Sequence, residues 1–141
     1  MAGRLAGDAV DYVGGLAREA IAKPLAEGDP VAALRSFVEL WRAGFEQSGY
    51  RAGCPIAAVA AERHDDAPEL LDRAAAAFEN WREAFAECLR TAGLTPARAD
   101  RMAALVVSGV EGAILLSRAE RTPRPLLDVA TELETAIRTA L

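Results

Sequence analysis

Two tryptophans and four phenylalanines are the side chains of this sequence best suited to binding an apolar ligand. Large aromatic rings line many small-molecule pockets, although a single aromatic residue more often belongs to an ordinary core. As a group they favour a ligand cavity, and we expect it to touch at least two of the primary candidates: Trp41, Phe45, Phe78, Trp81 and Phe85. Phe37 and Val59 are secondary candidates for the same cavity.

Glu111 is the one acidic side chain within the most apolar stretch of the chain, residues 102–116. It could provide a polar contact in the ligand cavity or across a subunit interface, so we include it among the candidate ligand-binding residues. The alternative, which we favour, is a buried carboxylate satisfied by an arginine or by backbone groups, because burying an unpaired charge is unfavourable.

The remaining reactive side chains predict no metal site, cofactor or disulfide framework. Cys54 precedes a helix, where a thiolate is favoured; a redox role is conceivable, but a small buried capping residue is the more frequent arrangement. Cys88 falls on the inner face of its helix and is interpreted as core. His64, the single histidine, could help to bind a metal beside Asp65 and Asp66, whereas isolated loop histidines usually face solvent.

Catalytic motifs are missing from the sequence. There is no glycine-rich loop after a strand, no HExxH motif, and one histidine offers no credible catalytic triad. Ser108 and Ser117 have no base nearby in the sequence, and the acidic residues 65, 66 and 69 fit a solvated helix start. We therefore predict that the protein is not an enzyme.

The composition, with 52% hydrophobic and 6% aromatic residues, favours packed helices over a sheet. Its 141 residues suffice for a core, and we expect a single domain over 1–141. The net charge of −5 gives no attraction for DNA, RNA or an anionic membrane. The first ten residues lack the basic start and apolar run of a signal peptide, so we expect a cytoplasmic protein with reduced thiols.

Six segments show helical periodicity, and none alternates as a strand would. Prolines, glycines, Asp29 and Thr95 mark their ends. The predicted helices are 5–26, 30–47, 55–62, 68–92, 96–121 and 126–141. In the fourth helix, Leu71, Phe78 and Phe85 mark the expected buried face. The sequence thus predicts an all-α, six-helix orthogonal bundle.

The helix predicted over 96–121 is apolar around nearly its whole circumference, so it must be covered on more than one side. A small domain can cover one face of a helix about 37 Å long. A second copy of the chain most simply covers the other face. A helix wholly buried in a monomer ranks second, and a membrane span is weak because Glu111 interrupts a run shorter than about 20 residues.

We therefore expect the last two helices of two chains to form a four-helix bundle across a two-fold axis. Gly109 and Gly112 weaken a helix, and close helix approach at the dimer interface would explain them. The expected interface residues are Val106, Gly109, Val110, Gly112, Ala113, Leu116, Leu126, Val129 and Leu133.

A family resemblance is carried by three segments: GCPIAAVAAE (53–62), FENWREAFAECLRTAGL (78–94) and VVSGVEGAILLSRAERTPRPLLDVATEL (106–133). They resemble the C-terminal region of TetR-type transcriptional repressors. The GCPI turn and the VEGAILLSRAERTP segment together are similar to the subgroup with an LmrA/YxaF-like C-terminal domain.

The resemblance implies an all-helical domain that binds a small hydrophobic or amphipathic inducer and dimerises through its last two long helices. It also implies that the ligand moves the helix leading in from an N-terminal helix-turn-helix, which releases operator DNA. We expect this chain to comprise only the sensor and dimerisation half, and to bind DNA only through an N-terminal domain that it lacks. A purely structural dimerisation module with a filled core and no ligand is the alternative.

Overall fold

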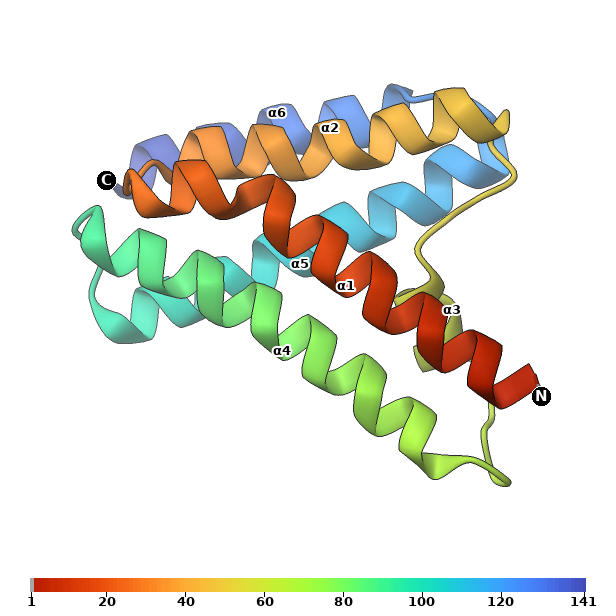
Figure 1. Cartoon of the computed structure of the whole chain (residues 1–141). Helices are drawn as coiled ribbons and strands as arrows, with labels where there is room; N and C mark the ends of the chain where they lie inside the picture. Colours follow the sequence, from red (N-terminus) through yellow and green to blue (C-terminus); the bar gives the residue numbers. More distant parts are fainter. Residues whose placement is uncertain (1) are drawn as a thin grey trace.

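The computed structural model describes residues 2–141, which form six α-helices joined by short connections (Figure 1). They are α1 (Ala2–Ala26), α2 (Pro30–Ser48), α3 (Pro55–Ala61), α4 (Pro68–Thr91), α5 (Pro96–Glu120) and α6 (Arg124–Ala140). The predicted all-α class and the six helices are confirmed, and no strand occurs in this described range. The largest boundary differences are the starts of α1 and α6, which lie at residues 2 and 124 instead of 5 and 126.

The helix ends follow from local chemistry. The Asp29 side chain accepts a hydrogen bond from the Ala32 amide at 3.0 Å, and the Thr95 hydroxyl accepts one from the Arg98 amide at 3.3 Å. At the other end of α2, Gly49 adopts a left-handed φ of 61°, which costs little without a side chain. This turn sends residues 50–54 away from α2 and toward α3 (Figure 1).

The helices enclose one cluster of buried side chains, to which all six contribute. Figure 1 shows α2 and α6 side by side, with α1 crossing between α2 and α4 and with α5 behind it. Ser117, fully buried near the end of α5, accepts a hydrogen bond from the Leu126 amide at 3.0 Å. That bond ties the end of α5 to the start of α6, so the short connection between them is fixed from inside.

One detail of the predicted core is wrong at the start of α4. Leu70 is buried with 4% of its surface exposed, whereas Leu71, predicted to be buried, is 49% exposed. Residues 70, 74, 81 and 85 form the buried stripe of this helix, so the true register is one residue earlier than expected at its first turn.

Candidate functional site

Five aromatic side chains of α2 and α4 pack together between these two helices. The ring of Phe37 lies at the centre of this aromatic cluster. Its centroid is 5.2 Å from that of Trp81 and 5.5 Å from that of Phe85, in edge-to-face contacts. Trp41 and Phe78 complete the aromatic cluster at centroid distances of 6.0 and 5.8 Å from Trp81. Phe37, Trp81 and Phe85 are fully buried, so these three candidate ligand-binding residues pack as core between α2 and α4.

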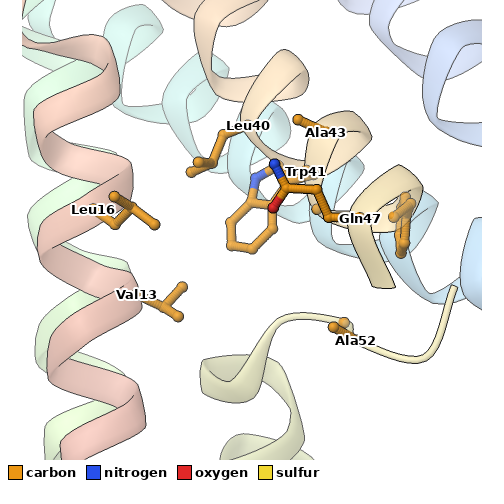
Figure 2. Close-up of a pocket in the computed structure, with 10 residues that line it drawn as sticks. Val13, Leu16, Leu40, Trp41, Ala43, Gln47 and Ala52 are labelled. Carbon is orange, nitrogen blue, oxygen red and sulfur yellow. The ribbon is translucent and has the colours of Figure 1, made fainter. Parts of the chain in front are cut away.

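An apolar groove lies beside the aromatic cluster, between α1, α2 and the loop that follows α2 (Figure 2). We call it groove A; its volume is about 300 Å³. Two of the primary candidates, Trp41 and Phe45, form part of its wall. The complete lining is Val13, Leu16, Leu40, Trp41, Ala43, Gly44, Phe45, Gln47, Ala52 and Gly53.

A second groove, groove B, lies on the other side of the same loop, between α1, α3 and α5. Its volume is about 510 Å³. Val13, Ala52 and Gly53 line both grooves, so grooves A and B are neighbours. The remaining lining residues of groove B are Cys54, Pro55, Ala57, Ala58, Ala61, Ile114, Leu115 and Arg118. Sequence analysis missed these residues because most are small; the GCPI turn was the only signal pointing to this region.

Glu111 lies close to Cys54 but does not line groove B, and 9% of its surface is exposed. Neither carboxylate oxygen has a hydrogen-bond partner among residues 2–141, so the favoured prediction of an arginine or backbone partner is wrong. Burial raises the pKa of Glu111 to about 7. The neighbouring Cys54 thiol opposes this rise without forming a hydrogen bond of normal geometry.

Both cysteines are buried, and neither forms a disulfide. Burial, together with the charge of Glu111, raises the pKa of the Cys54 thiol to about 12. Burial also raises the pKa of the Cys88 thiol to about 11. Both thiols are therefore protonated near neutral pH, which removes the thiolate that redox sensing requires.

The other candidate residues are dispersed. Val59 is buried on the inner face of α3, and its backbone carbonyl oxygen lies 2.8 Å from Nε2 of His64. Trp81 lines a separate and more polar hollow together with Arg18, Arg73 and Asn80. Across the part of the chain that the structure describes, no group of three or more His, Cys, Asp or Glu side chains is arranged to hold a metal ion.

The expected dimer residues divide into two groups. Val106, Val110, Ala113, Leu126 and Leu133 are between 0% and 5% exposed, so they pack inside their own subunit and leave no surface for a partner. Gly109 lies directly under Leu133 and Val129 of the same chain. Leu116 is 52% exposed, and at Gly112 no atom lies within 4 Å of the position that a Cβ would take.

The exposed side of α5 carries a continuous stripe at helical spacing: Leu105, Ser108, Gly112, Leu116 and Ala119. We call these five residues the α5 stripe. Ser108 directs its hydroxyl to the Leu105 carbonyl of its own helix at 3.4 Å, so its polar group is partly satisfied locally. By length and composition α5 is long and apolar enough to cross a membrane, and half of its most apolar segment is buried within this fold.

The fold resembles a crystal structure of a TetR transcriptional regulator from Chloroflexus aurantiacus, with a TM-score of 0.70 and 30% sequence identity over 92% of this chain and 68% of that one. The family model for the LmrA/YxaF-like C-terminal domain of transcriptional regulators matches residues 30–132. This chain therefore belongs to the TetR-type transcriptional regulators, as a C-terminal domain of the LmrA/YxaF-like group. The resemblance predicted from the sequence is confirmed, and the family is one of regulators and not of enzymes.

Two relatives illustrate the extent of the match. An uncharacterised HTH-type transcriptional regulator of Mycobacterium tuberculosis is 37% identical over 126 residues, which cover 84% of this chain and 62% of the relative. The HTH-type regulator YxaF of Bacillus subtilis is 28% identical over 135 residues, covering 95% of this chain and 71% of YxaF. The chain thus spans less than two thirds of the length of the mycobacterial relative.

Proposed function

We propose that this chain is the ligand-sensing and dimerisation part of a cytoplasmic transcriptional repressor, and that a small apolar or amphipathic molecule binds in grooves A and B. The observation that carries the proposal is the apolar wall of groove A, in which Trp41 lies opposite Val13 and Leu16 of α1 (Figure 2) and which Phe45 also lines. Its volume of about 300 Å³ lies at the lower end of the range for ligand sites.

The same arrangement supports a mechanism. Val13 and Leu16 of α1 form one side of groove A, so a bound molecule contacts this helix directly. A ligand that fits one position of α1 better than another shifts the population toward that position. In a full-length repressor, the shift of α1 would release operator DNA from a helix-turn-helix outside residues 1–141.

Dimerisation through α5 and α6 is the second part of the proposal. The α5 stripe leaves apolar side chains in water, with Leu105 48% and Leu116 52% exposed. Isologous contact between two copies would remove this surface from water. The buried residues of the same two helices support the stripe from behind.

Filling groove A tests the ligand site. Gly44 lines the groove, and no atom lies within 4 Å of the position that a Cβ would take there. In the Gly44→Leu variant the new side chain therefore starts from a Cβ that meets no atom, at a residue that lines the groove. We expect the native chain to bind the neutral probe N-phenyl-1-naphthylamine with increased probe fluorescence, and Gly44→Leu to weaken binding by about ten-fold or more.

The matched control is Gly15→Leu, at another helical glycine with open space, in the polar hollow on the other side of α1. This variant should bind the probe like the native chain. Equal probe affinity in Gly44→Leu and the native chain would exclude groove A as the site. No probe binding at all would favour a purely structural dimerisation module.

A further inference from the structure

We propose that the ligand is an amphipathic anion whose apolar part lies in grooves A and B and whose negative group binds the guanidinium of Arg118. This inference rests on the proposed ligand-sensing function and specifies its ligand class. Its starting point is the charge of the lining: among all side chains that line the two grooves, Arg118 is the only charged one. The chain as a whole carries an excess of acidic residues, with a net charge of −5, so a solitary cation at this place is not a reflection of the average surface.

Arg118 is held in a defined position at the edge of groove B. Its Nε donates a hydrogen bond to the carbonyl oxygen of Arg51 at 3.1 Å. Its Cδ lies 3.2 Å from the place where a Cβ of Gly53 would be, so the side chain crosses directly over the loop. Because a single N–H serves the backbone, the two terminal nitrogens of the guanidinium keep their donors for a carboxylate or another anionic group.

No acidic side chain of the described chain neutralises this arginine. The ion pairs of residues 2–141 join other arginines to Asp or Glu, and Arg118 takes part in none of them. Seven other arginines have a carboxylate within 4.0 Å: Arg35, Arg42, Arg63, Arg73, Arg90, Arg124 and Arg138. Arg118 shares the lack of an acidic partner with other arginines of the described residues, and it is the arginine that lines groove B.

A cationic ligand fits the same grooves less well. Glu111, the buried acid of α5, does not line either groove, and its two oxygens are covered by protein. A ligand cation would thus meet Arg118 as a like charge and no accessible carboxylate. A neutral ligand would leave the guanidinium without a counter-charge. An anion with an apolar body matches both the charge and the apolar lining.

Three probes with the same ten-carbon chain and different head groups test the proposal: decanoate, decan-1-ol and decyltrimethylammonium, each below its micellar concentration. Calorimetric titration of the native chain should show decanoate binding about ten-fold more tightly than decan-1-ol, because a charge-assisted hydrogen bond to arginine is added. Decyltrimethylammonium should bind more weakly than decan-1-ol. The preference for decanoate should shrink as the salt concentration rises.

Substitution of the arginine assigns the preference to one side chain. In Arg118→Gln, decanoate should bind about ten-fold more weakly and decan-1-ol should be unaffected, whereas Arg118→Lys should retain most of the preference for decanoate. The matched control is Arg98→Gln, which removes the same charge from an exposed position about 30 Å away along α5 and should change neither affinity.

The outcomes separate this proposal from the function on which it rests. Decanol and decanoate of equal affinity in the native chain would overturn the anion proposal while leaving the ligand-sensing function intact. Loss of decanoate binding to the same degree in Arg98→Gln and Arg118→Gln would also overturn it. If none of the three probes binds, both the anion proposal and the ligand-sensing function are wrong. If Arg118→Gln weakens decanoate and decan-1-ol equally, the other two measurements apply. A native preference for decanoate that Arg118→Lys retains supports the proposal, and a preference that Arg118→Lys loses overturns it.

Discussion

Glu111 is the residue whose burial has the clearest energetic consequence. Its carboxylate lies in an apolar setting without a hydrogen-bond partner, which raises its pKa from 4.5 to about 7. Because the pKa of this acid is higher in the folded state, the folded protein loses this proton at a higher pH than the unfolded chain does. The unfolded state is therefore stabilised by ionisation first, and the free energy of unfolding falls between about pH 4.5 and 7.

Replacing this acid by an apolar residue of similar length tests that sign. The free energy of unfolding of the native chain should decrease by up to about 3 kcal/mol between pH 5 and pH 8, measured by urea denaturation. Glu111→Met should lose most of this decrease and be the more stable protein at pH 8. Glu19→Met, at an exposed acid of α1, should keep the native pH dependence. A Glu111→Met curve parallel to the native curve would show that Glu111 is ionised in both states.

The helix α1 is attached to α4 at two points along its length. The indole Nε1 of Trp81 donates a hydrogen bond to the carbonyl oxygen of Gly14 at 3.1 Å. Nearer the N-terminus, Arg73 pairs with Asp11 and lies against Gly7, where a side chain would displace it. Because Trp81 also contacts Trp41 of groove A, the first attachment joins the proposed ligand site to α1.

Removing the donor of Trp81 should loosen α1 without removing the ring. We expect Trp81→Phe to speed amide hydrogen exchange in α1 around residues 14–18 and to destabilise the fold by about 1–3 kcal/mol, through the lost hydrogen bond and the smaller ring. Trp41→Phe is the control, because Nε1 of Trp41 has no partner to lose. Equal exchange rates in α1 for the two variants would mean that the Trp81 hydrogen bond does not hold this helix.

Sequence patterns predicted the helices better than the space between them. Asp29, Thr95 and the prolines act within one turn of the chain, so helix ends were predicted to within three residues. The grooves depend on side chains that are absent, at Gly44 and Gly53, and on the path of residues 50–54. Of the predicted ligand-binding residues, Trp41 and Phe45 line groove A, whereas Phe37 and Phe85 pack against each other where rings of α2 and α4 meet; their role in binding a ligand stays a prediction.

The α5 stripe leaves apolar side chains uncovered along α5, Leu105 and Leu116 among them. The sequence predicts a partner for α5 because this helix is apolar around nearly its whole circumference. It did not identify which residues face outward, because Val106, Val110 and Ala113 and the exposed Leu105 are equally apolar. Only the placement of α4 and α6 against α5 separates the two sets.

A charge placed on the stripe should separate a dimer. Leu116→Glu is expected to raise the dimer dissociation constant by about 100-fold in sedimentation equilibrium, because two carboxylates would be buried near a two-fold axis. Leu71→Glu is the matched control, since Leu71 is 49% and Leu116 52% exposed. Gly112→Leu, which meets no atom within its own subunit, should weaken the dimer too. A native chain that is monomeric at micromolar concentration, or a dimer unaffected by Leu116→Glu, would place the interface elsewhere or remove it.

Val13 lines both groove A and groove B, which flank the 50–54 loop. Two compounds, one in groove A and one in groove B, would contact the same turn of α1. Two such compounds present together would influence each other's affinity reciprocally, as thermodynamic linkage demands. In the proposed sensor, a ligand in groove A and a ligand in groove B would therefore act on the same turn of α1.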